Sequence, residues 1–321
     1  MKAIVCTKYG PPEVLELKET PKPTPKDKEV LIRVKATSVT VADARVRGFN
    51  VPPSYWLPAR LALAITKPRK QVLGIEMSGI IEVVGNKVRK FKIGDEVYTT
   101  TIRFGGYAGY VCFSEKAAIA IKPKNISFEE AATLPVGALT ALYFLRAANV
   151  RAGHQVLIYG ASGSVGTYAI QLAKHFGAEV TAVCSSVNTD LVKSLGADHT
   201  IDYTREDFTN NGKTYDILFD VVGKTSLNKN VRSLKKKGVY LHSIASPGIS
   251  IQMKIKGLLS SKKFVGGGPS PCTADLDYLM DLVEKGILKP VIDRTYSLEQ
   301  MIEAHRYVDT GRKKGNVAIT V

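Results

Sequence analysis

The chain has 321 residues, 45% of them hydrophobic and 23% charged, which is the composition of a globular protein and excludes a disordered, collagen-like or coiled-coil chain. The length predicts two domains, and the net charge of +16 includes short clusters of Lys and Arg that we interpret as a solvated basic surface. No apolar stretch approaches the ~20 residues of a membrane span, the first residues do not resemble a secretory signal, and the four cysteines are far apart, so we expect a cytoplasmic protein.

The first third of the chain is rich in short β-strand patterns. Branched apolar residues gather in several short runs, and Gly-Asn and Gly-Asp pairs mark turns between the later ones. The proline-rich segment 20–27 cannot enter the interior of a sheet, so it is expected to be a connector. A β domain is therefore predicted here, with strands at 3–5, 15–17, 30–36, 79–85 and 96–99.

From about residue 125 the pattern changes to alternating strands and helices. Ser127 and Glu130 form a capping-box pattern, which predicts the start of a helix. Beyond it, continuous apolar runs separated by helical segments predict a parallel sheet covered on both faces, and hence an α/β domain. Thr273 and Ser297 are predicted to cap two later helices. The expected elements are strands at 155–159, 179–184, 217–222, 239–241 and 316–321, and helices at 165–174 and 191–195.

A glycine-rich turn lies between the strand at 155–159 and the helix at 165–174. In this turn, Gly163 would let the backbone approach a pyrophosphate, and Gly166 would let helix and strand pack closely. Ala161 takes the place of the first glycine of the dinucleotide-binding pattern. The unpaired N–H groups at the start of the helix would face the anion. This strand–turn–helix context predicts a dinucleotide site, and a glycine-rich turn without a ligand is the alternative.

The end of the second strand of this domain, roughly 20 residues further on, is where NAD and NADP are distinguished. An acidic side chain there would bind the ribose hydroxyls of NAD, but this chain carries Ser185 and Ser186. Two hydroxyls could donate hydrogen bonds to a 2′-phosphate that no carboxylate repels. The residues therefore favour NADPH over NADH, with counter-charge supplied from farther away by Lys193, Arg205 or the basic segment 312–314.

With these motifs in place, nearly the whole chain resembles the zinc-independent medium-chain dehydrogenases/reductases, in the branch of quinone oxidoreductases and alkenal (ene) reductases. The motifs are specific to that superfamily and not to a substrate. They comprise residues 1–4, 14–17, 73–79, 88–97, 134–141, 161–166, 195–198, 202–203 and 220–223.

The resemblance implies a split domain layout. A GroES-like β domain of residues 1–124 would be completed by 271–321, and a Rossmann domain of residues 125–270 would be inserted between them, with the nicotinamide in the cleft. The edge strand at 264–268 would pair across a two-fold axis, which implies a homodimer. Asn188 stands where some relatives place a lysine. The cofactor-binding residues, including the two serines above, are Thr140, Ser162, Gly163, Ser164, Val165, Ser185, Ser186, Tyr203, Val222, Gly223 and Ser243.

Zinc-dependent members of the superfamily use a Cys, a His and a Cys or Asp as catalytic ligands. At the matching positions this chain has Thr40, Ile75 and Val136, whose side chains supply no nitrogen or sulfur ligand. Glu76, beside the missing histidine, is retained, and the four closely spaced cysteines of the structural zinc lobe are missing. We therefore expect no zinc.

Without a metal, the chain is expected to reduce acceptors that are already electrophilic, namely quinones and α,β-unsaturated carbonyls. Thr40, Arg45 and Tyr55 are the candidate catalytic residues, as hydrogen-bond donors to the developing oxyanion. Arginine is a poor proton donor but a good anchor for an oxyanion. The apolar segment 49–70 is interpreted as a lid that selects bulky acceptors, with packing in the core as the alternative.

The sequence leaves two other functions open. One is a zinc-free alcohol dehydrogenase or carbonyl reductase, which would reduce NADP when given an alcohol. The other is a non-catalytic NADPH-binding protein whose basic surface contacts RNA or an anionic membrane. For the favoured function we expect a small-molecule quinone or enone substrate, and no specific nucleic-acid or membrane partner.

Overall fold

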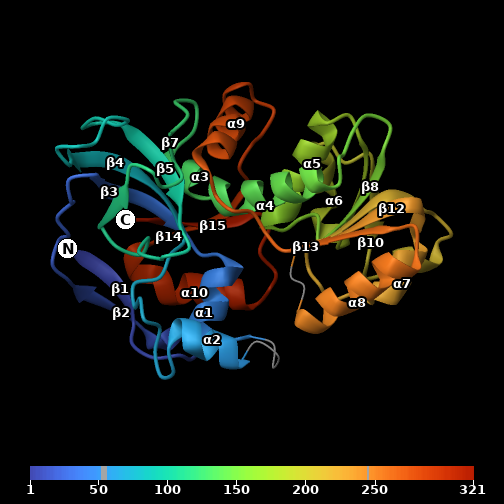
Figure 1. The fold of residues 1–321 in the computed structure, drawn as a ribbon, viewed down its shortest axis with the longest axis horizontal. Helices are drawn as coiled ribbons and strands as arrows, with labels where there is room; N and C mark the ends of the chain where they lie inside the picture. Colours follow the sequence, from blue (N-terminus) through green and yellow to red (C-terminus); the bar gives the residue numbers. More distant parts are fainter. Residues whose placement is uncertain (52–55, 244–245) are drawn as a thin grey trace. The chain divides into compact units, whose positions relative to one another are not determined.

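The computed structural model describes residues 1–51, 56–243 and 246–321, and these form two compact units (Figure 1). One unit is built on a mainly antiparallel β-sheet and the other on a parallel sheet with helices, so the predicted α/β fold with a separate β domain is confirmed. The first unit comprises Met1–Val136, Pro271–Gly286 and Pro290–Val321, and the second comprises Gly137–Ser270 with Ile287–Lys289.

The first unit is organised around a long strand, β3 (Glu29–Ser38). Its other strands are β1 (Lys2–Cys6), β2 (Leu15–Glu19), β4 (Glu76–Val84), β5 (Glu96–Thr100), β6 (Tyr110–Ser114), β7 (Ile119–Ile121), β14 (Ile292–Ser297) and β15 (Asn316–Thr320). The large sheet has the order β14-β15-β3-β4-β5-β7, with β6 also paired to β3, while β1 and β2 form a separate antiparallel pair. The strands β14 and β15 therefore complete the sheet that β3 begins.

The helices of the first unit begin largely where the sequence predicts. Ser127 with Glu130 and Ser297 with Gln300 form the expected capping boxes, so these two predictions are confirmed. The prediction for Thr273 is wrong, because the preceding Cys272 occupies the cap position and the Thr273 hydroxyl donates to the Ala117 carbonyl at 3.3 Å. The helices are α1 (Val41–Gly48), α2 (Trp56–Leu63), α3 (Phe128–Ala132), α9 (Thr273–Glu284) and α10 (Met301–Asp309).

Arg47 on α1 is a buried cation held by one acidic residue. Its side chain is 2% exposed, and its Nη2 lies 2.6 Å from Oδ2 of Asp309. Nε and Nη1 of Arg47 have no hydrogen-bond partner among the described residues. We expect Asp309→Ala to leave an unpaired buried charge and to lower the free energy of unfolding by about 3 kcal/mol.

A matched control for this prediction involves Arg306, which lies on α10 together with Asp309. Glu13 and Arg306 form an exposed ion pair at 2.7 Å, so Glu13→Ala should cost less than about 1 kcal/mol. Chemical denaturation measures both free energies of unfolding, and equal losses in the two variants would contradict the role assigned to Asp309.

The second unit contains a six-stranded sheet whose paired strands all run parallel. Its strands are β8 (Gln155–Tyr159), β9 (Glu179–Cys184), β10 (His199–Asp202), β11 (Tyr215–Asp220), β12 (Leu234–His242) and β13 (Lys263–Gly266). The order β10-β9-β8-β11-β12-β13 makes β8 and β11 neighbours, although two strands separate them in sequence. In a doubly wound sheet of this order, ligands bind beyond the carboxyl ends of the strands at this switch point.

The strands at 155–159 and 179–184 and the helix at 165–174 are confirmed. The predicted strand 217–222 instead ends at Asp220, whose side chain binds the next backbone N–H groups and turns the chain. The helices are α4 (Leu134–Ala147), which begins in the first unit, α5 (Ser164–His175), α6 (Thr189–Ser194), α7 (Leu227–Arg232) and α8 (Pro247–Leu259). Among the described residues, none of the helices combines the length and the apolar character needed to cross a lipid bilayer.

Candidate functional site

The glycine turn after β8 has the backbone that a bound pyrophosphate requires. Gly160 has φ +85°, and a Cβ at this position would lie 2.4 Å from Cγ2 of Val222. A Cβ at Gly166 would lie 2.3 Å from the carbonyl oxygen of Gly160, so both glycines are fixed by close packing. Gly163 differs from them, because its Cβ would meet only the Gly160 oxygen at 3.5 Å. The space beside Gly163 is therefore open, as close approach of a ligand to the backbone demands.

Gly163 also occupies the cap position of α5 and offers no side chain to the first turn of that helix. The first turn of α5 contains no acidic residue. Backbone donors and the positive end of the helix dipole therefore face this turn without a carboxylate to neutralise them. This part of the site fits the phosphates of a dinucleotide.

Two serine hydroxyls beside the turn are held by one amide. Nδ2 of Asn188 lies 3.0 Å from Oγ of Ser162 and 3.3 Å from Oγ of Ser185, and both serine oxygens accept from it. The hydrogens of these hydroxyls therefore stay available as donors. Oδ1 of Asn188 is buried and has no hydrogen-bond partner among the described residues. An unpaired buried acceptor usually marks a place where a further donor belongs, and the hydroxyls of a ribose would supply one.

The far end of this site contains a carboxylate that sequence reasoning missed. Asp202 ends β10 and pairs in register with Cys184 at the end of β9. Hydrogen bonds from Thr204 hold the pKa of Asp202 below its usual range, and a weaker bond from Ser186 adds to this. The guanidinium of Arg205 lies 3.7 Å from the same carboxylate and is 82% exposed. Arg205, one of the cations predicted to balance a 2′-phosphate, therefore already faces an acid.

The loop after β11 forms the other side of the turn. Oδ1 of the buried Asp220 accepts the N–H groups of Val222 at 3.0 Å and Gly223 at 2.7 Å. Its Oδ2 accepts the hydroxyl of Thr225 at 2.7 Å. These bonds direct Val222 against Gly160, so the carboxyl ends of β8 and β11 meet. The predicted residues Val222 and Gly223 thus lie beside the turn with their N–H groups already engaged.

The remaining predicted cofactor residues lie on separate elements of the second unit. A Cβ at Gly137 on α4 would lie 2.7 Å from Oγ of Ser164, so α4 packs directly on the start of α5. Thr140 is half-buried on α4, one turn beyond Gly137. The Ser243 hydroxyl donates to the Val221 carbonyl at 3.0 Å. Tyr203 is 54% exposed, with its ring centroid 6.3 Å from that of Tyr159, and Val165 is half-buried in the first turn of α5.

In the first unit, the candidate catalytic residue Thr40 is the cap of α1. Its Oγ1 accepts the backbone N–H of Asp43 at 3.1 Å and donates to Oδ2 of the same residue at 2.6 Å. The hydroxyl proton of Thr40 is therefore engaged in a hydrogen bond to the Asp43 carboxylate. Arg45 is exposed on α1, and its guanidinium has no ion pair or hydrogen bond to another described side chain. Tyr55, the third candidate, lies outside the described residues.

Behind Thr40 lies a buried polar chain. Asp43 is fully buried, accepts the Gly74 N–H at 3.1 Å and is hydrogen-bonded by Tyr107. Nε2 of His305 lies 3.2 Å from the hydroxyl of Tyr107. Burial raises the pKa of Asp43 to about 6, although its hydrogen bonds oppose the shift. Burial also lowers the pKa of His305 to about 3, so this histidine is neutral at physiological pH.

Glu76 is the second buried carboxylate of the first unit. It accepts the hydroxyl of Ser38 and, at 2.7 Å, the backbone N–H of Val136. Burial raises its pKa to about 7, and the nearby charge of Asp43 acts in the same direction. Lys313 partly opposes this shift. Glu76 is therefore close to half-protonated at neutral pH.

The donor chemistry around Glu76 does not fit a catalytic zinc ion. Thr40, Ile75 and Val136, at the positions where zinc ligands are expected, carry no nitrogen or sulfur donor, and the oxygens of Glu76 and Asp43 already accept hydrogen bonds. Within residues 1–51, 56–243 and 246–321, no group of three or more His, Cys, Asp or Glu side chains is arranged to hold a metal.

The raised pKa of Glu76 makes the stability of the chain depend on pH. The pKa rises from an ordinary 4.5 to about 7 on folding, so the folded state retains a proton that the unfolded state releases between these values. The stability from this group is fully present below pH 4.5 and is lost as the pH rises to about 7. The loss amounts to about 3 kcal/mol. Glu76→Gln keeps the shape without the titration, so its free energy of unfolding should fall less between pH 5 and 8.

Chemical denaturation at the two pH values tests this prediction. Glu82→Gln on the same strand is the control, because Glu82 is more exposed and paired with Lys22, which lowers its pKa. An unchanged pH dependence in Glu76→Gln would show that the buried glutamate is ionised throughout this range.

The fold and the site define the class of protein: a dinucleotide-binding protein with one β unit and one doubly wound α/β unit. Two family models match it, the alcohol dehydrogenase GroES-like domain over residues 26–124 and the zinc-binding dehydrogenase domain over residues 195–319.

Individual relatives narrow this class. The chain is 34% identical to 2-methylene-furan-3-one reductase of Solanum lycopersicum and 32% identical to the chloroplastic NADPH-dependent alkenal/one oxidoreductase of Arabidopsis thaliana. Each match covers 99% of this chain and 79% of the relative. The solved quinone oxidoreductase from Coxiella burnetii is 31% identical and matches with a TM-score of 0.90, over 100% of this chain and 99% of that one. The chain therefore belongs to the medium-chain dehydrogenases/reductases, in the branch of quinone oxidoreductases and alkenal reductases, and the resemblance found in the sequence is confirmed.

Proposed function

We propose that this chain is an NADPH-dependent oxidoreductase that transfers hydride to quinones or α,β-unsaturated carbonyl compounds without a metal ion. The observation that carries the proposal is the open turn at Gly163, with the start of α5 and two serine donors beside it. Relatives named as an alkenal/one oxidoreductase, a furanone reductase and a quinone oxidoreductase support the substrate class.

The residues of the second unit would hold the cofactor. Backbone groups of Gly163, Ser164 and Val165 would bind the pyrophosphate with the hydroxyl of Ser162, while Ser185, Ser186 and Tyr203 would face the adenosine phosphate. When bound, NADPH supplies a hydride equivalent from its nicotinamide. Thr140, Val222, Gly223 and Ser243 would line the remainder of the site.

The residues of the first unit would act on the substrate. A quinone or enone accepts hydride at carbon without prior ionisation, so the chain has only to orient it and stabilise the developing negative charge on oxygen. The guanidinium of Arg45, which no described side chain engages, supports a role as an oxyanion anchor, since it remains charged and has several donors. Thr40 would act mainly as a positioning residue, because its proton is bonded to Asp43.

Turnover assays test this function directly. We expect NADPH to be oxidised in the presence of at least one member of a panel of quinones and enones, followed by the fall in NADPH absorbance. Calorimetry run in parallel reports binding of NADPH by itself. Binding without turnover on any acceptor would favour the non-catalytic alternative, and reduction of NADP by an alcohol would favour a zinc-free alcohol dehydrogenase.

Removal of metal ions is expected to leave the rate unchanged. The positions of the missing zinc ligands carry Thr40, Ile75 and Val136, which cannot coordinate a soft or borderline divalent ion. The turnover rate is measured with the same assay before and after dialysis against a chelator. Elemental analysis of the purified protein reports its metal content. Stoichiometric zinc whose removal abolishes turnover would overturn the metal-free mechanism.

We also propose a homodimer formed through β13. This strand is the last in the sheet order, and its outer edge has no partner strand among the described residues. Light scattering should then report twice the mass of one chain, and a monomer at all concentrations would contradict it. The expectation that the protein is cytoplasmic stays a prediction.

A further inference from the structure

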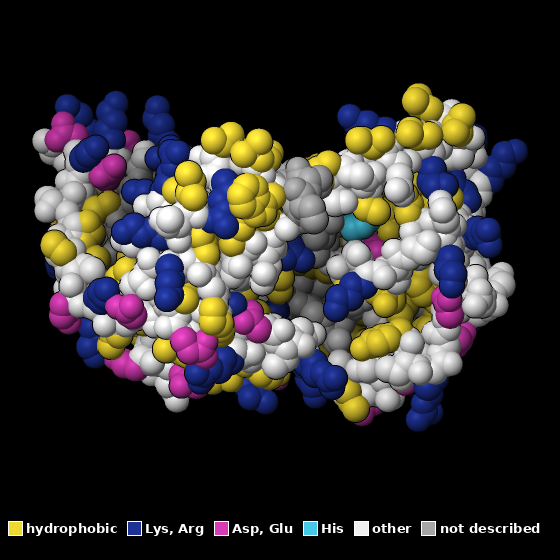
Figure 2. All heavy atoms as spheres, turned by 90° about the horizontal axis from the view of Figure 1, so that it is seen from below, with side chains coloured by type: hydrophobic (Ala, Val, Ile, Leu, Met, Phe, Trp, Pro, Cys, Tyr) yellow, Lys and Arg dark blue, Asp and Glu magenta, His cyan; other side chains and the backbone are white. Residues whose placement is uncertain are grey.

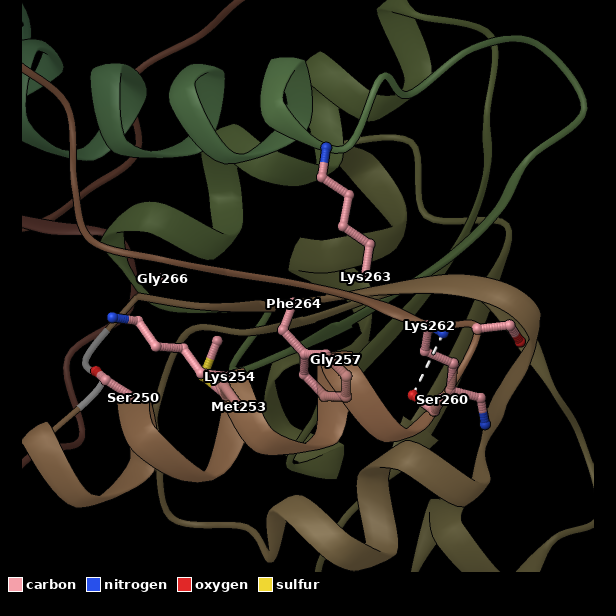
Figure 3. A pocket seen from close by; sticks show the side chains of 10 residues that line it. Ser250, Met253, Lys254, Gly257, Ser260, Lys262, Lys263, Phe264 and Gly266 are labelled. Carbon is pink, nitrogen blue, oxygen red and sulfur yellow. Dashed lines mark hydrogen bonds between the residues drawn. The ribbon is translucent and has the colours of Figure 1, made fainter.

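Exposed apolar side chains gather on two helices, α8 and α2. Figure 2 shows hydrophobic side chains in separate groups on the surface, with Lys and Arg side chains beside them. In the second unit, α8 forms a groove of about 600 Å³ with β13 (Figure 3), and this surface adjoins the strand edge through which the proposed homodimer forms. In the first unit, Trp56, Leu57 and Leu61 of α2 are 51%, 63% and 68% exposed. The apolar side chains of α2 therefore need an explanation of their own.

The guanidinium of Arg60, on α2, lies among three aromatic rings. Its Cζ is 3.8 Å from the ring centroid of Phe49 and 5.1 Å from those of Tyr9 and Trp56. The rings of Tyr9 and Phe49 also pack together, with their centroids 4.9 Å apart. Cation–π attraction is strongest where the cation has lost part of its water, and Arg60 is half-buried here. The ring cluster of Tyr9, Phe49 and Trp56 therefore engages the cation of α2.

Packing in a core does not fix the position of α2. The helix has eight residues, none of them buried, and a helix of this length is marginally stable by itself. Hydrogen bonds hold its carboxyl end: the Tyr9 hydroxyl donates to the Leu63 carbonyl at 2.8 Å, and Nη1 of Arg60 donates to the Ile65 carbonyl. The place of α2 in the first unit therefore depends strongly on Arg60.

The ring closest to this cation belongs to the residue that ends α1. Phe49 is the C-cap of α1 and has φ +50°, a left-handed conformation that strains a residue with a side chain. Its N–H bonds to the carbonyl groups of Arg45 and Val46 and so closes the last turn of the helix. The contact between Arg60 and Phe49 therefore joins α2 to the turn of α1 that carries Arg45, the proposed oxyanion anchor.

We propose that Arg60 is a positioning residue that holds α2 as an apolar wall for the acceptor molecule. The role rests on the proposed function, because the acceptor in question is a quinone or an enone. Trp56, Leu57 and Leu61 would contact the hydrocarbon part of the acceptor, while Arg45 binds its oxygen. A planar apolar acceptor suits this wall, because the indole offers a ring for stacking and the aliphatic side chains gain from being covered.

Steady-state kinetics of Arg60→Met test the proposal, because methionine removes the charge and keeps an unbranched side chain. The acceptors are matched pairs that differ in their apolar part: 3-nonen-2-one against 3-penten-2-one, and 1,4-naphthoquinone against 1,4-benzoquinone. We expect KM for the larger acceptor to rise about tenfold, with kcat changed less than about twofold and KM for the smaller acceptor little affected. The Kd for NADPH should stay unchanged in calorimetry, because the ring cluster lies in the first unit. Arg60→Lys should give an intermediate KM, since it keeps a cation but loses the planar stacking.

Trp56 supplies a second readout that does not depend on turnover. It is the only tryptophan of the chain, so tryptophan fluorescence reports on α2 alone. Acrylamide should quench this fluorescence more strongly in Arg60→Met than in the wild type, because α2 is held less firmly. Arg69→Met is the matched control, since Nη2 of Arg69 also binds α2, at 3.0 Å from the Leu61 carbonyl, and not through the ring cluster. This variant should keep the wild-type KM and quenching.

The outcomes separate the role of Arg60 from the proposed function. Stronger quenching with an unchanged KM would make Arg60 a purely structural residue and overturn the proposal, as would no change in either. Equal rises in KM for the larger and smaller acceptors, or the same rise in Arg69→Met, would also overturn it. Thermal unfolding checks the fold, and if Arg60→Met does not fold, a wild-type KM in Arg60→Lys would contradict the proposal. A wild type that binds NADPH but reduces no acceptor would contradict the proposed function itself, and the role of Arg60 would fall with it.

Discussion

Gly163→Ala is expected to weaken NADPH binding strongly without disturbing the fold. The backbone at Gly163 has φ −84° and ψ 179°, which alanine adopts freely, and the new methyl group would meet only the Gly160 oxygen at 3.5 Å. The same methyl group would occupy the space through which a pyrophosphate approaches the backbone. We expect the Kd for NADPH to rise about a hundredfold, which corresponds to about 3 kcal/mol.

Two other glycines make this experiment specific. Gly166→Ala would place a methyl group 2.3 Å from the Gly160 oxygen, so it should lower the thermal stability of the chain as well as binding. Gly268→Ala meets nothing within 4 Å and should change neither. Calorimetry with NADPH and thermal unfolding of the free protein separate the three cases. Unaltered binding in a folded Gly163→Ala would falsify the assignment of the turn.

Ser185→Asp is expected to change the cofactor preference from NADPH toward NADH. The hydroxyl of Ser185 is held by Asn188 beside the turn, and an aspartate there would repel a 2′-phosphate and accept hydrogen bonds from ribose hydroxyls. Like charges in such proximity cost several kcal/mol, so kcat/KM with NADPH should fall about a hundredfold. We expect kcat/KM with NADH to be unchanged or higher.

Ser194→Asp serves as the control for charge alone. Ser194 is exposed at the end of α6 and its hydroxyl bonds to the Leu191 carbonyl, away from the turn. Steady-state kinetics with both cofactors measure the preference. A wild type that already prefers NADH, or a Ser185→Asp variant with an unchanged ratio, would contradict the role of the Ser185 hydroxyl.

The parts of the site that could be predicted from sequence are those governed by local geometry. The glycine turn is one, since the conformations of Gly160 and Gly166 are demanded by atoms within a few residues or in the adjoining strand. The strands of the second unit could be predicted equally well, because a parallel sheet buries both faces of each strand and so requires continuous apolar runs. The family assignment followed from motifs of this kind spread along the whole chain.

The parts that escaped prediction depend on contacts between distant segments. Asp202 approaches the end of β9 only because β10 pairs with it in the sheet, so an inspection of the residues after β9 could not find it. The burial that raises the pKa of Glu76 is likewise set by tertiary packing. Thr40 is different, because a signal was present: Thr40 and Asp43 have the spacing of a capping box, with an aspartate in place of the usual glutamate.

The sheet of the first unit has a consequence for how the chain is synthesised. β3, made among the first forty residues, receives its neighbour β15 only from residues 316–320, and Arg47 receives its counter-ion from residue 309. A ribosome would therefore synthesise the chain as far as residue 320 before this unit can close, whereas the six parallel strands of the second unit are complete by residue 266. The second unit should accordingly be the first to acquire its native structure during translation, while the β unit stays incomplete until residue 320 has been synthesised.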